Sequence, residues 1–405
     1  MNVNRRTKYT INIIAYATLI ISSFWGLYFM APGIAKALFS LCIWMGIFIF
    51  PYKLVKNNDF TRTTNFILIY IIFTDIIQIL RSVFSTDEYL YIIGNKWTTL
   101  FGNEYTALLL LPPIFTYLGT LKYSVIHLKN TTYIYMILGL IFSVYLKYPL
   151  SILTIFLVVF YPYVSKKYKL LIIISGLETF LCAVVGDNPP RMYFIVIAFT
   201  ICCYILIYVI KKDLLTKLFV IIVTISPIVL FLPMLNASNN EETIFQKIQT
   251  MLTDRNDNEF AADTRTFLYT EMATDLTKTE SWLIGKGASG HYYSYFFDNS
   301  KLGKYGRISS EVPFLTFLLK GGMMYVFAYF GLLLYAIYLG IWKGKNKFVK
   351  SIGIIASGWY FNCFVGDIVG CRFYHLAFFA LLGCCLSHKW LNSTDEDIKL
   401  ILKQK

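Results

Sequence analysis

The chain has 405 residues, of which 57% are hydrophobic, 18% aromatic and only 15% charged. Soluble chains carry about 25% charged residues, so a soluble globular protein could not bury this much apolar surface. The formal net charge of +14 would indicate a nucleic-acid partner in a soluble protein. Here, however, the lysines and arginines lie in short clusters between apolar runs, which indicates membrane topology and argues against nucleic acid.

The N-terminal segment predicts a first membrane-spanning helix. Residues 1–8 are basic, and the apolar run 9–30 that follows has the length of a spanning helix, about 20 residues. This run is too long for the apolar part of a signal peptide, and no small-residue cleavage site follows it. We therefore expect this helix in the mature protein.

Further apolar runs of spanning length recur along the chain. The least certain pair is 131–146 and 148–164, which Lys147-Tyr148-Pro149 either separates as a tight turn or joins as a kink. In the long run 312–342, Lys320-Gly321-Gly322 is a candidate break. The remaining predicted spans are 33–51, 65–84, 105–121, 170–186, 192–210, 214–234, 350–370 and 372–388. The pattern predicts an all-α integral membrane protein with about twelve transmembrane helices.

Basic residues alternate between the junctions that connect these spans. Lysines and arginines concentrate in the junctions that a cytoplasmic N-terminus would place inside, such as 165–169 and 343–350. The short junctions on the other side hold only isolated cations. The positive-inside rule then predicts that both termini are cytoplasmic. The predicted parts are spans one to nine (1–235), an exported loop (236–310), spans ten to twelve (311–388) and a cytoplasmic tail (389–405).

The exported loop 236–310, between spans nine and ten, is the only large hydrophilic segment. Its residues 241–252 carry apolar side chains at helical spacing, and residues 261–276 do so again. The second helix would have Phe267, Leu268, Met272 and Leu276 on one stripe and Asp263 or Thr264 as its cap. A long loop that keeps amphipathic helices is expected to fold over the membrane face, and such loops often carry function.

The eight cysteines predict neither a disulfide framework nor a metal site. All of them lie within or at the edge of apolar spans, and the adjacent pairs lack metal-ligand spacing. They are expected to be ordinary small residues of membrane helices. We therefore predict no metal and no cofactor.

Arginines on the predicted exported side are candidate phosphate ligands, because guanidinium presents a planar fork of donors and stays charged. Arg191 follows two prolines that fix the chain where span eight begins; the alternative is an interfacial anchor. Arg265 lies in the first turn of the second loop helix, where the helix dipole disfavours a cation unless an anion is bound. If they bind no phosphate, Arg265 and Arg307 are ordinary side chains on a solvated surface. Arg372 would share a helical face with His375.

Three residues are candidates for a general base toward a sugar hydroxyl. Glu311 stands where span ten begins, and its alternative role is to cap that helix. His291 is the only histidine of the exported loop. Asp187 lies close to Arg191 in the sequence and is either a base or the partner of that arginine.

Charged residues inside the predicted spans are functional candidates by default. They would line a proton path in a transporter, or they would pair with other groups within the bundle. The loop is also rich in aromatic residues, which either stack on sugar rings or form an interfacial belt. The charged residues within spans are Asp75, Glu178, Lys320 and Asp367.

The order of these features resembles the Wzy-type O-antigen polymerases and the related O-antigen ligases. Arg191 opens a span, and the long loop follows two spans later. Within that loop Asp263-Thr264-Arg265 starts a helix, and the segment Trp282-Leu283-Ile284-Gly285-Lys286-Gly287 comes next. A polar motif then enters a span that contains a glycine-rich stretch, 311–322. The resemblance covers about residues 170–342 by motif order and the whole chain by hydropathy.

The resemblance implies a metal-independent glycosyltransferase that joins undecaprenyl-pyrophosphate-linked oligosaccharide repeat units at the outer face of the cytoplasmic membrane. Arg191 and Arg265 would stabilise the leaving pyrophosphate, with the other arginines and His375 as further ligands. The partners implied are the lipid-linked glycan, membrane lipid and a chain-length regulator. Many members carry a histidine just before the span that follows the loop, where this chain has Ser310-Glu311. Either Glu311 substitutes, or His291 serves, or no such base is needed.

Two alternative functions are open at this point. A ligase would transfer the finished glycan to another acceptor, although the expected histidine is missing. A flippase or transporter for lipid-linked oligosaccharides would explain the charges inside spans. The chain shows no repeated half and no matching pair of interrupted spans, which many transporters have.

Overall fold

The computed structural model describes residues 59–84, 103–146, 159–185, 192–235, 266–294, 306–366 and 373–403. These segments form helices joined by turns, and their only β-type pairings are two isolated bridges, so the all-α prediction is confirmed for them. Several predictions lie outside the described residues. They are the first two spans, the turn or kink at residues 147–149 with most of the span 148–164, the helix 241–252, the candidate caps Asp263 and Thr264, and the side chains of Asp187, Arg191, Arg265, Asp367 and Arg372.

Helices occupy the predicted spans that fall within the described residues. They are α3 (Arg62–Val83), α6 (Asn103–Thr120), α7 (Lys122–Leu146), α9 (Lys166–Val185), α10 (Met192–Tyr204), α11 (Asp213–Phe231), α15 (Pro313–Tyr338), α16 (Lys347–Val365) and α17 (Phe373–Leu386). Short helical segments of other types extend three of them: π-helices at Ile205–Ile210 after α10 and at Leu339–Lys343 after α15, and a 3-10 helix at Leu232–Leu235 after α11. The loop contributes α13 (Thr266–Lys278), and the tail forms α18 (His388–Asn392) and α19 (Asp395–Lys403).

Within the described residues, four helical stretches are long and apolar enough to cross a membrane: Arg62–Val83, Asp213–Leu235, Pro313–Lys343 and Lys347–Val365. Their length and composition support membrane association. Shorter apolar helices are Ile197–Ile210 and His375–Leu386. The number of spans and the side that each end faces stay predictions.

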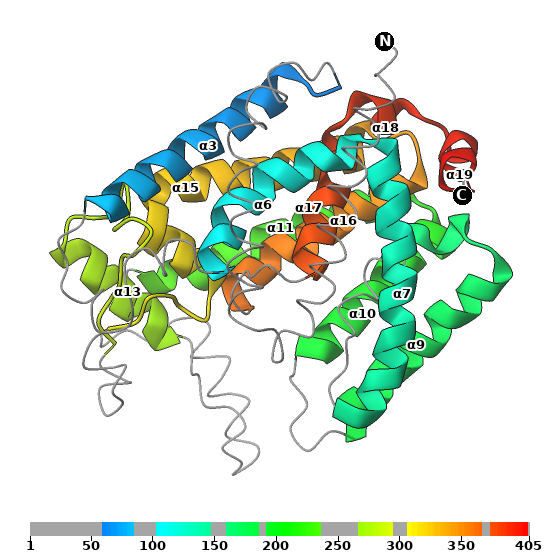
Figure 1. The fold of residues 1–405 in the computed structure, drawn as a ribbon, viewed down its shortest axis with the longest axis horizontal. Coiled ribbons are helices and arrows are strands. Elements are labelled where there is room, and N and C mark those ends of the chain that lie inside the picture. Colours follow the sequence, from blue (N-terminus) through cyan, green and yellow to red (C-terminus); the bar gives the residue numbers. More distant parts are fainter. Residues whose placement is uncertain are drawn as a thin grey trace.

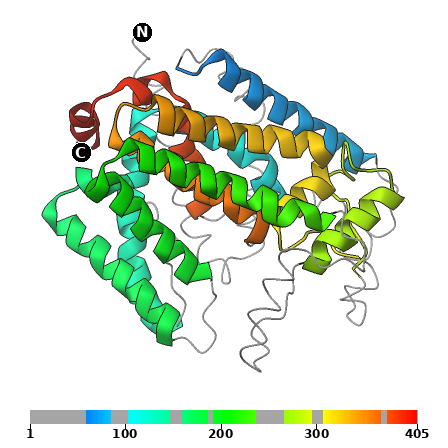
Figure 2. The ribbon, with the colours of Figure 1, turned by 180° about the vertical axis from the view of Figure 1, so that it is seen from behind.

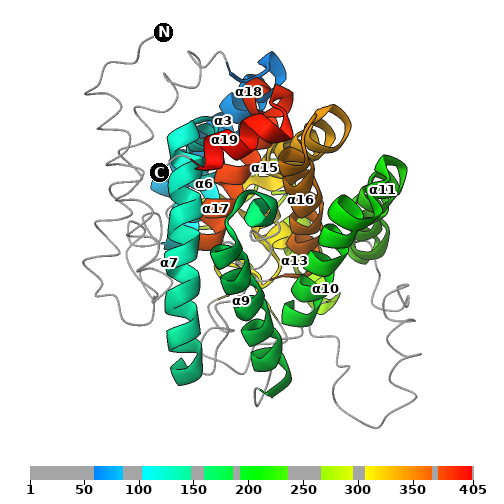
Figure 3. The same cartoon turned by 90° about the vertical axis from the view of Figure 1, so that its right-hand side faces the viewer.

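Helices α3, α15 and α11 run lengthwise through the molecule (Figures 1 and 2). Helix α13 and its neighbouring turns lie at one end, which we call the loop end; α18 and α19 lie at the other, the tail end. Helices α7 and α9 stand together at the side of the bundle, where the rings of Tyr133 and Tyr168 stack with centroids 4.2 Å apart (Figure 3).

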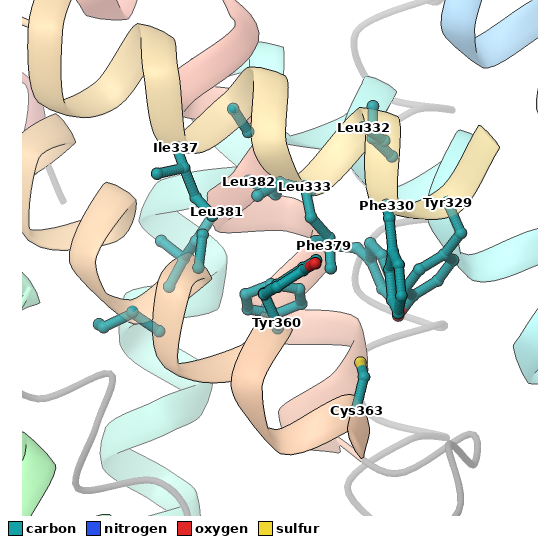
Figure 4. Close-up of a cluster of buried hydrophobic side chains, with 14 of the residues drawn as sticks. Tyr329, Phe330, Leu332, Leu333, Ile337, Tyr360, Cys363, Phe379, Leu381 and Leu382 are labelled. Carbon is teal, nitrogen blue, oxygen red and sulfur yellow. The ribbon is translucent and has the colours of Figure 1, made fainter. Parts of the chain in front are cut away.

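The core lies where α15 packs against α16 and α17 (Figure 4). The rings of Phe330 and Phe364 lie 5.3 Å apart there, and α15 is buried over most of its length. Helices α6 and α17 cross at Gly119 and Gly383, where an added Cβ atom would overlap the backbone of the opposite helix. Small residues at the contact let the two backbones approach closely, a feature that is also common where helices of membrane proteins cross.

The tail end is closed by side chains that bind backbone groups. Asn346 caps α16 by accepting a hydrogen bond from Val349 N, and its Nδ2 donates to the carbonyls of Trp390 and Ser393 at 2.8 and 2.9 Å. Asp395 accepts hydrogen bonds from Tyr163 Oη at 3.0 Å and from Lys347 N at 2.8 Å. The tail is therefore docked onto the bundle, which its sequence did not predict.

Candidate functional site

Helix α15 is broken at Gly322, as the glycine pair predicted. Gly322 has a φ of 62° and a ψ of −165°, which is not helical. In an unbroken helix, the amides of residues 323 and 324 would bind the carbonyls of residues 319 and 320. The break leaves these four groups without their helical partners, and such groups must be satisfied inside a membrane protein.

A turn of the loop replaces the missing helical bonds on both sides of the break. We call residues 282–290 the docking turn. Its amides bind the carbonyls that the break exposes, and its carbonyls bind the exposed amides. The bonds are Lys286 N to Leu319 O at 2.7 Å, Gly287 N to Lys320 O at 2.9 Å, Met323 N to Trp282 O at 2.8 Å and Met324 N to Leu283 O at 3.1 Å. The docking turn thus supplies the backbone hydrogen bonds that a helix of spanning length lacks at its break, and we call this set of four bonds the splice.

Glycines make this splice sterically feasible. A Cβ atom on Gly322 would overlap the carbonyl of Leu283, and one on Gly285 would overlap the carbonyl of Lys320. Both residues also have positive φ angles, which favour glycine. Gly285 and Gly322 therefore permit the close backbone contact between the docking turn and α15.

The docking turn does not form a phosphate-binding loop, although its glycine content invites that interpretation. Its amides from Gly285 to Gly290 all donate within the protein. Besides the bonds to α15, Ala288 N binds Gln78 O at 3.2 Å and Ser289 N binds Ser82 Oγ at 2.8 Å, both on α3. No amide in this stretch is left to cradle an anion.

Two lysines hold the end of the docking turn. Lys320, only 1% exposed, donates from Nζ to the carbonyls of Ala288 at 2.8 Å and Gly290 at 2.7 Å. Lys286 forms an ion pair with Asp275 of α13 and donates to the His291 carbonyl at 3.0 Å. Lys320 is one of the four charged residues predicted inside spans, and backbone carbonyls of the docking turn bind its ammonium group.

Directly after the docking turn, the chain pairs with the segment that leads into α15. Tyr292 and Arg307 form an antiparallel bridge, with N-to-O distances of 3.0 and 2.8 Å. The Arg307 guanidinium then lies 3.3 Å from the Glu311 carboxylate. The structure thus brings together two of the predicted site residues, and Arg307 is not a simple solvated side chain.

Glu311 does not cap α15, so the capping alternative is wrong. The residue at the cap position is Val312, followed by Pro313 in the first turn, and no side chain accepts a capping hydrogen bond there. The side chain of Glu311 is 43% exposed and that of its partner Arg307 is 20% exposed. A solvent-facing carboxylate beside a guanidinium remains available as a base.

Tyr292 and Glu271 complete what we call the loop-end cluster, which consists of Glu271, Tyr292, Arg307, Ser310 and Glu311. Burial raises the pKa of Tyr292 to about 12, the charge of Arg307 and the Ser310 hydroxyl lower it, and the charges of Glu271 and Glu311 raise it. The phenol is therefore neutral at physiological pH. In the sequence, Tyr292 is only one of the aromatic residues in which the loop is rich, and Glu271 carries no signal, because nothing local connects α13 to this bridge.

The two histidines have different surroundings. His291 precedes Tyr292, and its ring packs on the backbone of Gly306, with the Tyr293 ring edge-on at 6.5 Å. His291 thus adjoins the loop-end cluster. His375 is 2% exposed and lies edge-on to Trp359 at 5.2 Å, inside the bundle. This interior position is the one expected for an ionisable residue within a span, and the role of His375 as a ligand stays a prediction.

Helix α13 is anchored by the predicted apolar stripe. Leu268, Met272 and Leu276 are fully buried, which confirms three of the four predicted members of the stripe. The fourth, Phe267, is partly buried. The Tyr269 hydroxyl donates to the Phe364 carbonyl at 2.7 Å, and its ring stacks on Phe314 at 6.2 Å. Helix α13 is therefore fixed to α15 and α16.

Among the described residues, no group of three or more histidine, cysteine or acidic side chains lies close enough to hold a metal ion. The chain matches no family model, no characterised protein and no solved structure among those compared. The resemblance to Wzy-type polymerases therefore stays a prediction.

Proposed function

We propose that the chain is a membrane glycosyltransferase that polymerises undecaprenyl-pyrophosphate-linked oligosaccharide repeat units. The observation that carries this proposal is the splice of the loop into α15, which fixes Arg307 and Glu311 at the mouth of a helix of spanning length. A lipid-linked substrate needs its reacting groups at the membrane boundary, because its tail stays in the bilayer. The resemblance in motif order supplies the substrate class.

The reaction would be attack by an acceptor sugar hydroxyl on the anomeric carbon of the donor glycan. The bond from that carbon to the pyrophosphate breaks, and the pyrophosphate leaves with the electron pair. Glu311 would take the hydroxyl proton, with His291 as the second candidate. Arg307 would bind the leaving pyrophosphate after exchanging its contact with Glu311, together with Arg191 and Arg265. Arg372 is a further candidate ligand for the glycan, and Asp187 a further candidate base.

Transfer of the finished glycan by a ligase uses the same chemistry with a different acceptor. One observation favours the flippase alternative instead. Asp75 in α3 is 3% exposed, and neither carboxyl oxygen has a hydrogen-bond partner among the described residues. Buried acids in transport proteins often carry protons.

Variants expressed in cells that lack their own copy would separate these functions. We expect Arg191→Lys, Arg265→Lys and Glu311→Gln to stop polymer formation, so that single lipid-linked repeat units accumulate in the outer leaflet. Asp75→Asn should still form polymer. Arg62→Lys, at the tail end of α3, is the matched control for the arginine changes. Normal polymer in the two arginine variants, or inner-leaflet accumulation in Asp75→Asn, would reject the proposal.

A further inference from the structure

The position of Lys320 calls for a function, because a buried ammonium group is costly unless its donors are satisfied. It lies at the break of α15, in a run where every flanking side chain from Phe314 to Leu319, apart from Thr316, is apolar. An apolar side chain would fill the same place without the cost of removing a charge from water. The ammonium group must therefore do something that packing alone does not.

The ammonium group of Lys320 binds two carbonyl oxygens of the docking turn that converge on it. The Ala288 and Gly290 carbonyls both lie within 2.8 Å of Lys320 Nζ. Carbonyl oxygens that converge in this way repel each other unless a cation lies between them. The end of the docking turn can keep this shape because Lys320 supplies that cation.

The residues that follow are those of the candidate site. Gly290 is bonded to His291, and Tyr292 pairs with Arg307, whose guanidinium contacts Glu311. A continuous path therefore runs from the buried ammonium group, through the Gly290 carbonyl and the bridge, to the loop-end cluster. Lys286 adds a second tether on the His291 carbonyl, from the α13 side.

We propose that Lys320 is a positioning residue, which fixes His291 and the Tyr292–Arg307 bridge relative to the membrane-spanning part of α15. The inference rests on the proposed function for its catalytic consequence. The group does not touch the substrate; it sets where the residues that do so lie. Losing such a support typically costs 10- to 100-fold in activity.

The test compares Lys320→Met with Lys320→Arg and with Lys343→Met, which removes the same charge from the segment Leu339–Lys343 that follows α15. Full-length protein in lipid nanodiscs is measured in two ways. Hydrogen–deuterium exchange follows the amides of residues 286–292, with residues 395–403 of the tail as an internal reference. Polymerisation of a lipid-pyrophosphate repeat unit gives kcat and KM separately.

For Lys320→Met we expect faster exchange at residues 286–292, unchanged exchange in the tail, and a kcat lower by about 10- to 100-fold with KM within about threefold. Lys320→Arg, which keeps a cation, should recover most of the kcat, and Lys343→Met should match wild type. Unchanged exchange at residues 286–292, an equal kcat, or no recovery by arginine would overturn the proposal.

Two further outcomes are separable. If Lys320→Met does not accumulate in membranes, Lys320→Gln, which keeps amide donors, is measured against the same expectations. If the wild-type protein makes no polymer, the proposed function fails, while the exchange experiment still decides whether Lys320 holds the turn.

Discussion

Replacing Gly322 by alanine tests the splice between the docking turn and α15. The added methyl group would overlap the Leu283 carbonyl, and the residue would keep a φ of 62° with a Cβ atom present. The loop cannot retreat from the methyl group without losing its bonds to Met323 and Met324. The substitution therefore strains the backbone at residue 322 and also costs these two hydrogen bonds.

The magnitude follows from these two contributions. Gly322 combines a positive φ with an extended ψ of −165°, a region that essentially only glycine adopts, and a residue with a Cβ atom there pays about 1–3 kcal/mol. Loss of the two hydrogen bonds accepted by the Trp282 and Leu283 carbonyls costs about 0.5–1.5 kcal/mol each. Together they predict a destabilisation of about 2–6 kcal/mol, at the upper end of what single substitutions cause.

Gly331→Ala is the matched control, because Gly331 lies in the same helix and an added Cβ atom there meets nothing within 4 Å. Helix propensity predicts that this control is neutral or more stable by up to about 1 kcal/mol. The assay is equilibrium unfolding of the purified protein in detergent, read by tryptophan fluorescence. If the free energy of unfolding of Gly322→Ala lies within about 0.5 kcal/mol of that of the control, the contact between the docking turn and α15 does not contribute the predicted stability.

Three further predictions concern the anchors of the loop and the tail. Tyr269→Phe removes the donor to the buried Phe364 carbonyl and should destabilise the protein by about 1–3 kcal/mol, measured by the same unfolding assay; no change would contradict the hydrogen bond. Asp395→Ala removes the acceptor of Tyr163 Oη and Lys347 N, so limited proteolysis should release the tail; equal protection would refute its docking. Thr394 caps α19 by accepting a hydrogen bond from Asp397 N, and the amide and hydroxyl of Thr394 donate to the Asp397 carboxylate and lower its pKa. The stability from this cap is therefore present above the unfolded pKa of 3.8 and is lost only as the pH falls through the lower folded pKa. Exchange of residues 394–403 should therefore show no extra opening between pH 8 and about 5; opening within that range would contradict the sign.

Apolar runs in the sequence predicted the helices, because a helix that faces lipid or the protein core needs apolar side chains over its whole length. The stripe of α13 was predictable for the same reason, since Leu268, Met272 and Leu276 follow the helical period. The break at Gly322 was also predictable from two adjacent glycines. What replaces the helical bonds was not, because the splice joins backbone groups far apart in sequence and leaves no side-chain pattern.

The candidate site was predictable only in part. Arg307 and Glu311 stood out by their charge at the edge of a predicted span, but their contact depends on a non-helical turn between them. Glu271 reaches the cluster only because α13 packs on α15 and α16, which is a tertiary event. Docking of the tail depends in the same way on Asp395 meeting groups from two distant junctions.

The most direct test of the account is a reaction with purified wild-type protein in proteoliposomes. The substrate is a synthetic undecaprenyl-pyrophosphate repeat unit, supplied with a chelator of divalent metal ions. The account predicts polymer of several repeat units, with release of undecaprenyl pyrophosphate. Absence of polymer, or polymer that forms only after divalent metal is added back, would contradict it.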